Sequence, residues 1–165
     1  MELQKLEKID VLRVQQIAKL TWPDTFKEIL SASQIEYMLD WMYNIETLKQ
    51  QVEEGQLFYM LTHNDIDIGF IGVQNDFPVT GETKLHKIYV LPSSQGLGAG
   101  KILMNKAEQI AIENKSNYFV LNVNRYNKAT DFYLKLGFEI TYEENIDIGN
   151  GFLMEDFVMK KSLPK

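Results

Sequence analysis

A glycine-rich stretch, QGLGAG at residues 95–100, is the part of the sequence best suited to do chemistry through its backbone. It lies between an apolar run that ends in proline, LHKIYVLP, and a helix-like run, KILMNKAEQIAIEN. A tight loop that leads from a strand into a helix directs several backbone N–H groups, and the positive end of the helix dipole, at one point. That geometry suits an anion such as a pyrophosphate. Glycine permits positive φ and lets a ligand approach the backbone without an intervening Cβ.

Three phosphate-binding patterns can be tested on this loop. The Walker A pattern fails, because Gln95 stands where its first glycine belongs and Ile102 where its Ser or Thr belongs. The dinucleotide fingerprint fails as well, because its third glycine would fall on Lys101. The pattern Gln-x-x-Gly-x-Gly fits, with Gln95, Gly98 and Gly100. A glycine-rich turn that binds nothing is the alternative.

The composition limits what this chain can be. Its 165 residues suit one domain with a substantial core, and 45% hydrophobic and 24% charged residues are typical of a soluble globular protein. No apolar run is long enough for a membrane span, and the first residues lack the apolar core of a signal peptide, so we expect a cytoplasmic protein. The absence of cysteine excludes a thiolate metal site and a cysteine acyl-enzyme. The net charge of −6 argues against nucleic acid as a partner.

The hydrophobic pattern predicts the elements that position the loop. We expect a short strand within residues 2–8, a helix capped by Asp10, a break at Pro23, and a second helix over residues 35–44 behind a capping box of Ser33 and Glu36. Strands are predicted over residues 56–62 and 66–73, joined by the turn HND, and over 84–92. Helices follow at 101–114 and 128–137, with strands at 118–124, 138–144 and 152–161. The order is a β-meander followed by one strand–helix–strand crossover.

Two blocks of the sequence resemble a known family. LHKIYVLPSSQGLGAGKILMNKA is similar to the acetyl-CoA-binding signature of the GNAT superfamily of N-acetyltransferases, and LNVNRYNKATDFYLKLGF is similar to the next block of that family. The stretches TWPDTFKEILSASQIEYML and GFLMEDFVMKKSL resemble the bacterial PaiA-like branch of polyamine N-acetyltransferases. The resemblance implies an α/β GNAT fold over residues 1–165, with a mixed, mostly antiparallel central sheet splayed between its two middle strands and flanked by about four helices.

The resemblance also implies the residues that hold acetyl-CoA. The backbone of Ile88, Tyr89 and Val90 would pair with the pantetheine arm, as an extended amide chain can add to an exposed strand edge. Asn127 would orient the pantetheine or the following helix, and it could equally cap that helix. The pyrophosphate would be held by the loop residues Gln95, Gly96, Leu97, Gly98, Ala99, Gly100 and Lys101.

Acetyl transfer needs two protonic groups. An amine with a pKa near 10 is neutral in only about one molecule in 10³ at pH 7, and the leaving thiolate benefits from a proton donor. Tyr133 stands where the family keeps its tyrosine general acid, although it could be one more aromatic side chain on a buried helix face. His86 is the candidate base, because strand alternation would place Lys84, His86, Ile88 and Val90 on one face. A structural histidine is the alternative. Asn122 stands where relatives that acetylate N-terminal amines carry a glutamate base.

The sequence thus predicts an enzyme that moves the acetyl group of acetyl-CoA directly to a primary amine in a ternary complex, since no cysteine can carry the group. The expected acceptor is a polyamine or another small amine. The alternatives are acetylation of protein N-terminal or lysine amines, and a non-catalytic acyl-CoA-binding module. We expect no metal, no nucleic acid and no membrane partner. A homodimer is possible. The cluster Tyr37, Met38, Trp41 and Met42 is more typical of a core, but it would form the acceptor wall in this family.

Overall fold

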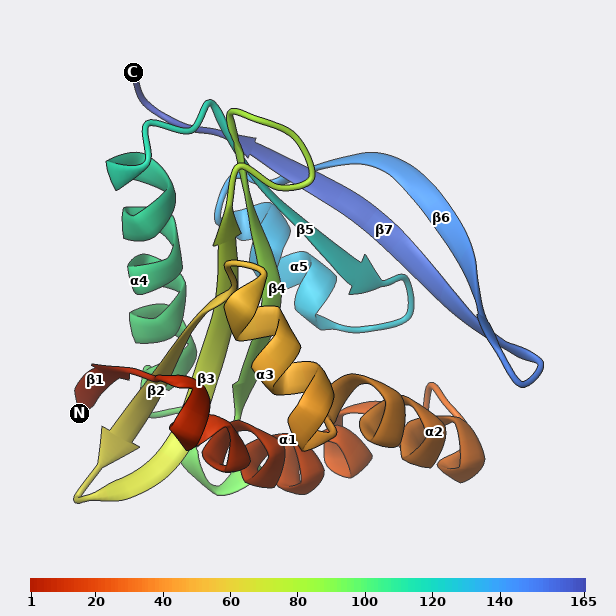
Figure 1. Cartoon of the computed structure of the whole chain (residues 1–165). Coiled ribbons are helices and arrows are strands. Elements are labelled where there is room, and N and C mark those ends of the chain that lie inside the picture. The colour runs from red at the N-terminus through yellow and green to blue at the C-terminus, as the bar shows by residue number, and fades with distance from the viewer.

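A seven-stranded mixed sheet forms the centre of the computed structural model, which describes residues 1–165 (Figure 1). The strands lie in the order β1-β2-β3-β4-β5-β7-β6. Only β4 and β5 run parallel, and they are joined by the single helical crossover that the sequence predicts. The strand bounds are β1 Glu2–Lys5, β2 Leu57–His63, β3 Ile66–Asn75, β4 Glu82–Val90, β5 Tyr118–Asn124, β6 Glu139–Gly149 and β7 Phe152–Ser162.

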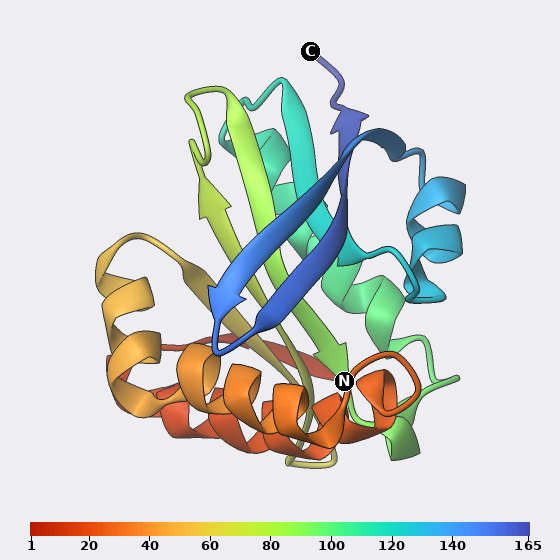
Figure 2. The ribbon, with the colours of Figure 1, turned by 90° about the vertical axis from the view of Figure 1, so that its right-hand side faces the viewer.

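Five α-helices cover the two faces of the sheet (Figures 1 and 2). They are α1 Val11–Phe26, α2 Ala32–Tyr43, α3 Ile45–Glu53, α4 Ala99–Glu113 and α5 Ala129–Lys135, and 3₁₀ turns occupy Lys8–Asp10 and Pro92–Ser94. The helices α1, α2 and α3 lie on one face, and α4 and α5 lie on the other. None of these helices combines the length and the apolarity that a membrane crossing requires.

Each face of the sheet has its own hydrophobic core. On the α4 side, Leu103 of α4 packs with Ile71 of β3 and Phe119 of β5 in a cluster of 18 buried residues. On the α1 side, Trp22 of α1 packs with Phe70 of β3 in a cluster of 15. Because strand side chains alternate between the faces, neighbouring residues of β3 serve different cores. The sheet is therefore held rigidly from both sides.

The middle of the sheet opens, as the GNAT resemblance implies. Strands β4 and β5 pair only from Glu82–Tyr118 to Leu85–Leu121, and beyond that point they diverge (Figure 1). The rest of β4 keeps its pairing with β3 on its other edge. The rest of β5 keeps its pairing with β7. One edge of each strand therefore faces a wedge-shaped opening in which backbone amides lack a strand partner.

A β-bulge lies at the point where β4 leaves β5. Lys87 pairs with Gly72 and Leu85 pairs with Val73, so that His86 has no partner on β3. A bulge interrupts the period-two alternation of side chains. Leu85 and Ile88 consequently both pack in the core on the α4 side, and the two residues between them both turn toward α1 and α3. The predicted common face of His86 and Ile88 is therefore wrong.

The predicted strands are all present, and the helical region near residue 40 needs correction. Helix α2 is capped by Ser31, whose hydroxyl accepts a hydrogen bond from the backbone N–H of Gln34 (3.1 Å), and not by Ser33. Helix α3 was not predicted. Its signal is the cap residue Asn44, which accepts from the N–H of Thr47, followed by one apolar face.

The first helix also differs from the expectation at both ends. Pro23 lies inside α1, which continues to Phe26. The Asp10 side chain does not cap α1, because its carboxylate accepts from the backbone N–H of Glu7 in the preceding 3₁₀ turn. The chain has five α-helices where about four were expected.

Packing of α4 against the open sheet requires a glycine at position 69. A Cβ there would lie 2.8 Å from the carbonyl oxygen of Tyr89 and 3.1 Å from Leu103 Cδ1. We expect Gly69→Ala to lower the free energy of unfolding by about 1–3 kcal/mol through overpacking. Gly100→Ala is the matched control, because a Cβ at Gly100 meets nothing within 4 Å and alanine favours helix. Denaturant unfolding should show the first variant destabilised and the second unchanged or stabilised; equal stabilities would contradict this account of the packing.

Candidate functional site

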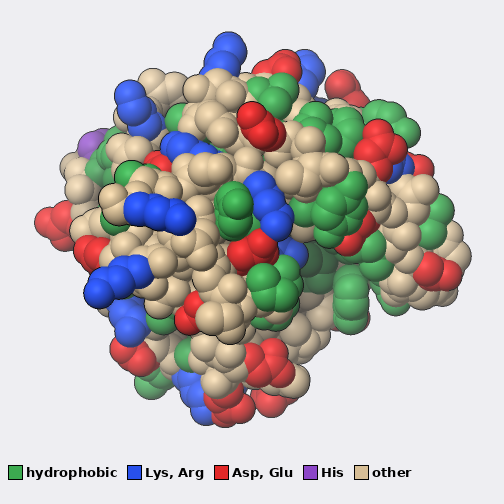
Figure 3. All heavy atoms as spheres, turned by 90° about the horizontal axis from the view of Figure 1, so that it is seen from above, with side chains coloured by type: hydrophobic (Ala, Val, Ile, Leu, Met, Phe, Trp, Pro, Cys, Tyr) green, Lys and Arg blue, Asp and Glu red, His purple; other side chains and the backbone are tan.

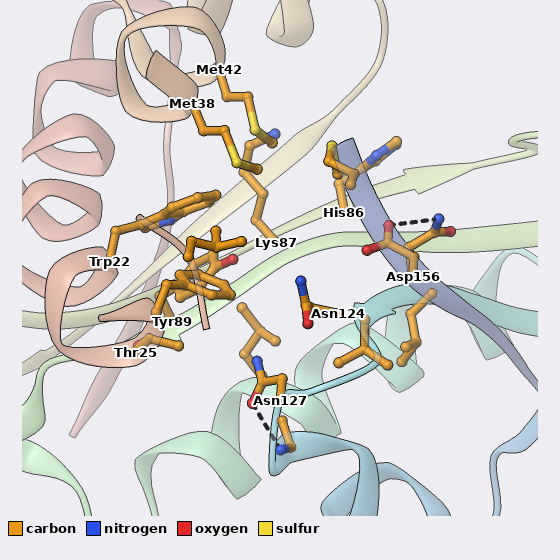
Figure 4. A pocket seen from close by; sticks show the side chains of 18 of the residues that line it. Trp22, Thr25, Met38, Met42, His86, Lys87, Tyr89, Asn124, Asn127 and Asp156 are labelled. Atoms are coloured by element: carbon orange, nitrogen blue, oxygen red, sulfur yellow. Dashed lines mark hydrogen bonds between the residues drawn. The ribbon is translucent and has the colours of Figure 1, made fainter. Parts of the chain in front are cut away.

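A cavity of about 330 Å³ opens where β4 and β5 separate. Its walls come from α1, α2, β4, β5, α5 and β7, so it draws on both hydrophobic cores. Figure 4 shows Trp22, Thr25 and Tyr89 on one side of it, His86 and Asp156 on the other, Met38 and Met42 above, and Asn124 and Asn127 below. The cavity is mostly apolar with a few polar groups directed into it, which is typical of a small-molecule site.

The glycine loop lies next to this cavity, at the start of α4. Gly96 and Gly98 have positive φ values of 86° and 80°, and Gly98 is the N-cap of α4 in a left-handed conformation. Ile102 is the first residue of α4 whose backbone N–H makes a helical hydrogen bond, and it donates to the Gly98 carbonyl (3.1 Å). The preceding amides are free for a ligand. A Cβ at Gly96, Gly98 or Gly100 would meet no protein atom within 4 Å, so the loop is an open cradle that fits a pyrophosphate.

The end of β4 connects this cradle to the cavity. Ile88, Tyr89 and Val90 line the cavity, and their strand edge toward β5 lacks a partner. The side chains of Ile88 and Val90 pack in the α4-side core, while the Tyr89 ring lies 5.7 Å from that of Trp22. The side chains are thus held by packing, and the backbone amides are left available to an extended amide chain.

Tyr133 projects from α5 into the cavity. It is 7% exposed, and its ring contacts Phe132 and Phe138 edge to face at centroid distances of 5.5 and 5.9 Å. Burial raises the pKa of its hydroxyl to about 12. The phenol is therefore fully protonated at neutral pH, and it can donate a hydrogen bond to a group that becomes negative nearby.

Asn127 lies one residue before the N-cap of α5, which is Lys128, and it still contacts the start of that helix. Its Oδ1 accepts a hydrogen bond from the backbone N–H of Ala129 (2.9 Å), which orders the start of α5. Its amide nitrogen points into the cavity (Figure 4). The residue can therefore order the helix that carries Tyr133 and also offer a donor to a ligand.

His86 lines the cavity, but its ring is already engaged. Its Nε2 lies 3.0 Å from Oε1 of Gln74, and Gln74 in turn donates from its amide to the carbonyl of Glu54. This chain fixes the Gln74 oxygen as an acceptor, so His86 Nε2 carries the proton. Burial, together with the charges of Lys87 and Lys84, lowers the pKa of His86 to about 3. The imidazole is neutral and is a weak base.

Lys87 is an unusual buried lysine beside His86. It is 4% exposed, and its ammonium donates to Gln51 Oε1 (2.9 Å) and Gln56 Oε1 (3.1 Å) without a carboxylate partner. It also lies over the ring of Phe58 at 5.4 Å. Burial first, and then the charge of Lys84, lower the pKa of Lys87 to about 7. Both hydrogen bonds go to neutral amides, so this lysine is held in place without a fixed counter-charge.

A buried carboxylate faces these residues from β7. Asp156 is 4% exposed and lies directly opposite Asn124 in the β5–β7 register. The amide of Asn122 donates to Asp156 Oδ2 (3.2 Å) and to Glu144 Oε2 (3.1 Å). Burial raises the pKa of Asp156, the hydrogen bond from Asn122 lowers it, and the burial effect is the larger. Asn122 thus supports two carboxylates.

An aromatic wall with unsatisfied polar groups closes the α1 side of the cavity. The rings of Trp22 and Tyr43 lie 5.7 Å apart, and both residues are at most 2% exposed. Neither Trp22 Nε1 nor the Tyr43 hydroxyl has a hydrogen-bond partner in the protein. Buried polar groups are usually paired, and the Tyr43 hydroxyl is close enough to the polar atoms of Trp22 and Tyr89 for these side chains to affect its pKa.

The β6–β7 hairpin and α2 meet at the end of the cavity that is lined by Met38 and Leu153. The Tyr37 hydroxyl donates to the carbonyl of Ile148 (2.6 Å), and Gln34 donates to the carbonyl of Leu153 (2.8 Å). The Tyr37 and Phe152 rings lie 5.4 Å apart, and Ile148 is buried in the α1-side core. The hairpin tip therefore lies against α2 (Figure 2). From above, a hollow floored by hydrophobic side chains lies between the main body and the β6–β7 side (Figure 3).

The structure gathers most of the predicted site residues and adds others. His86, Ile88, Tyr89, Val90, Gln95, Asn127 and Tyr133 all line the cavity, and the remaining loop residues lie at the neighbouring helix start. Met38 and Met42 serve both as core and as cavity wall, whereas Trp41 is exposed. Sequence reasoning missed Lys87, and it identified Asp156 only as one of several acidic residues near the last strands that could attract a polycation. Only burial distinguishes these two residues from ordinary charged strand residues. No three His, Cys, Asp or Glu side chains gather as a metal site.

Comparison with known proteins gives a consistent result. A family model described as an acetyltransferase (GNAT) domain matches residues 26–161. A spermidine N(1)-acetyltransferase of Thermoplasma acidophilum is 27% identical, covering 93% of this chain and 95% of that protein. A ribosomal protein bS18-alanine N-acetyltransferase of Haemophilus influenzae is 31% identical over 73% of this chain and 80% of that protein.

The structural comparison agrees. The crystal structure of the PaiA N-acetyltransferase from T. acidophilum, in complex with coenzyme A, superposes with a TM-score of 0.82 at 26% identity, and the match covers 98% of each chain. With a splayed sheet, an open glycine cradle and a family model that spans most of its length, this chain belongs to the GNAT acetyltransferase family.

Proposed function

We propose that this protein transfers the acetyl group of acetyl-CoA directly to a primary amine of a small molecule, with a polyamine as the favoured acceptor. The observation that supports the small acceptor best is the closure of the cavity by α2 and the β6–β7 hairpin. A peptide would need an open groove on that side, and the two hydrogen bonds and the ring contact of Tyr37 oppose such an opening.

The residues of the cavity suit direct transfer. The glycine loop and the β4 edge would hold acetyl-CoA, so that its thioester lies in the opening between β4 and β5. A neutral amine then attacks the thioester carbonyl, a C–N bond forms, the C–S bond breaks, and the CoA thiolate leaves. The nitrogen loses one proton as the amide forms, and this proton replaces the one that the thiolate takes up. Tyr133 would stabilise that thiolate by hydrogen bonding and supply its proton. With a pKa of about 12, Tyr133 is protonated before each turnover.

The charge around the cavity supports a cationic acceptor. Asp156 lies inside the cavity, and Glu144 lies beside it on β6. The carboxylate of Glu143 is partly compensated by Arg125, at 3.3 Å. These carboxylates on neighbouring strands could accommodate the spaced ammonium groups of a polyamine. Their electric field would raise the local concentration of such a polycation.

Acetylation of a protein N-terminus is the second candidate. It is favoured by the similarity to a ribosomal protein bS18-alanine N-acetyltransferase. Against it, Asn122 cannot take a proton, and the acceptor end of the cavity is closed. A non-catalytic acyl-CoA-binding module is the third candidate, and it leaves the buried hydroxyl of Tyr133 in the cavity without a role.

The anion cradle can be tested with two nearly isosteric substitutions. Asn and Asp both tolerate the left-handed backbone of Gly98, so Gly98→Asn and Gly98→Asp differ mainly in charge. We expect the Asp variant to bind acetyl-CoA at least about tenfold more weakly than the Asn variant, which corresponds to about 1.4 kcal/mol, because its carboxylate repels the pyrophosphate. Calorimetric titration at low and high salt measures this difference, which should shrink as salt rises. Equal affinities would show that no phosphate binds at Gly98.

The role of Tyr133 can be tested by removing one oxygen. Tyr133→Phe keeps the ring contacts with Phe132 and Phe138, and no hydrogen bond of the wild type is lost. We expect kcat to fall by roughly 10²–10⁴ with the affinity for acetyl-CoA and the melting temperature nearly unchanged. Steady-state kinetics with free thiol as the readout, combined with a binding titration, separates the two quantities. An unchanged kcat would remove Tyr133 from the chemical step.

The acceptor class can be tested with a panel of amines and peptides. We expect spermidine and spermine to be acetylated with a kcat/KM that declines as ionic strength rises, because the Debye length shrinks from about 10 Å at 0.1 M to about 3 Å at 1 M. A mono-amine of similar length should be a poorer substrate with a weaker salt dependence. Efficient acetylation of peptides without turnover of any polyamine would overturn the small-amine proposal and leave the acetyltransferase assignment intact.

A further inference from the structure

Asp156 is buried without the partners that a buried carboxylate normally has. Its side chain is in contact with the cavity, and the residue is 4% exposed. Its Oδ2 accepts one hydrogen bond from Asn122, and its Oδ1 accepts none from the protein. None of the ion pairs of the molecule includes it. A buried charge is costly unless it is paired, so this carboxylate lacks a cationic partner.

The charged groups that face Asp156 do not supply that partner. From β4, Lys84 attracts it through space without an ion pair, and Lys87 is engaged by two glutamine side chains. From β6, Glu144 repels it and shares its Asn122 donor. Arg125, which follows β5, is paired with Glu143 and Glu155. The neutral ring of His86 donates elsewhere.

The cavity itself is open to Asp156. Figure 4 shows its carboxyl group on the His86 side of the cavity, across from Tyr89 and higher in the view than Asn124. Two further buried polar groups of the same cavity, Trp22 Nε1 and the Tyr43 hydroxyl, make no hydrogen bond of good geometry, and the side chains next to the Tyr43 hydroxyl are those of Trp22 and Tyr89. The two observations are independent, because these residues come from α1 and the end of α2, and Asp156 comes from β7.

We propose that Asp156 binds the ammonium group of the acceptor and takes the proton that this group must lose before it attacks. The inference rests on the proposed function and adds to it the residue that recognises the amine and acts as its base. An ammonium ion would supply the missing hydrogen bond to Oδ1 and the missing positive charge.

The step is balanced. An N–H proton of the bound ammonium moves to the Asp156 carboxylate, and the nitrogen keeps the electron pair. That pair forms the bond to the thioester carbon, and the C–S bond breaks toward sulfur. Tyr133 protonates the thiolate, and the second proton that the nitrogen loses as the amide forms restores the Tyr133 phenol. Asp156 later releases its proton to solvent as the product leaves. Burial raises the pKa of Asp156, which brings this base closer to neutral pH than an ordinary aspartate.

Asp156 suits this role better than its neighbours do. His86 already donates from Nε2 to Gln74, and its pKa of about 3 leaves it a weak base. Lys87 is turned toward Gln51 and Gln56 at the α3 side, with its nitrogen over aromatic rings. Asp156 is the only carboxylate among the residues that line the cavity, and it is buried with a free acceptor atom.

The pH dependence of kcat/KM tests the proposal. If Asp156 takes the proton, the wild type uses the ammonium form of the amine. Its kcat/KM should then be independent of pH between the pKa of Asp156 and the pKa of the amine, which is near 10; this interval is the level region of the profile. Asp156→Asn keeps an oxygen that can accept from Asn122, so the fold should be retained. Because that variant can use only the neutral form of the amine, its kcat/KM should be lower by roughly 10²-fold or more at pH 7. Its kcat/KM should also rise about tenfold per pH unit as the neutral fraction of the amine increases.

Two further variants distinguish this role from a structural one. Glu155→Gln removes the carboxylate next to Asp156 on β7, which does not line the cavity, and the level region should remain. Asn122→Val removes the only donor to Asp156, which raises the pKa of Asp156 further, so the acidic end of the level region should move to higher pH. This second shift needs no change at Asp156 itself, and it tests the proposal even if Asp156→Asn fails to fold. Binding of spermidine to the CoA-bound enzyme should weaken in Asp156→Asn and persist in Glu155→Gln.

The outcomes separate this inference from the proposed function. A wild type that acetylates no amine or peptide contradicts both. Suppose instead that the wild type is active, that Asp156→Asn has a kcat/KM profile of the same shape, and that Asn122→Val shows no shift. This result overturns the role of Asp156 and leaves the proposed function intact. A wild-type profile that itself rises about tenfold per pH unit would show that no protein group takes the proton. A level profile for the wild type and a rising one for Asp156→Asn support the proposal.

Discussion

The structure depends on the early end of the pairing between β4 and β5. Beyond Leu85 and Leu121 the two strands have no common hydrogen bonds, which leaves buried backbone amides without partners in the middle of a sheet. Such groups are costly unless something satisfies them, and an extended amide ligand does so in the manner of an added strand. The rest of the fold keeps the opening in place. Helix α4 holds β3 and β4, and the hairpin β6–β7 holds β5, so each side of the opening has its own support.

The bulge at His86 sits at this branch point, and it decides which side chains reach the cavity. Because two successive residues of β4 turn to the same face, Leu85 and Ile88 stay in the α4-side core while Lys87 reaches across to Gln51 and Gln56. Strand periodicity read from sequence carries no signal for such an insertion, because the bulge is set by pairing with Gly72 and Val73 on another strand. This is why the predicted face of His86 failed although the strand itself was predicted correctly.

The parts of the fold that sequence could predict are those with local causes. The glycine loop, the two-residue turn at Asn64 and Asp65, and the helix periodicity of α4 all follow from neighbouring residues. The cap of α2 was placed two residues late because Ser31 and Ser33 both fit the pattern, and the choice depends on where α2 docks. The importance of Asp156 was not predictable in this way. In sequence it is one of several acidic residues near the last strands, and it becomes buried only because β7 inserts between β5 and β6.

Burial acts on every titratable group of the cavity in one direction, toward the neutral form. It lowers the pKa of Lys87 to about 7 and that of His86 to about 3, and it raises the pKa values of Tyr133 and Asp156. A cationic amine that enters the same space meets the same penalty. A carboxylate beside it reduces that penalty at binding, and a proton transfer between the two removes both charges at once. The low dielectric of the cavity therefore favours the neutral pair, carboxylic acid and free amine, and the free amine is the form that can attack a thioester.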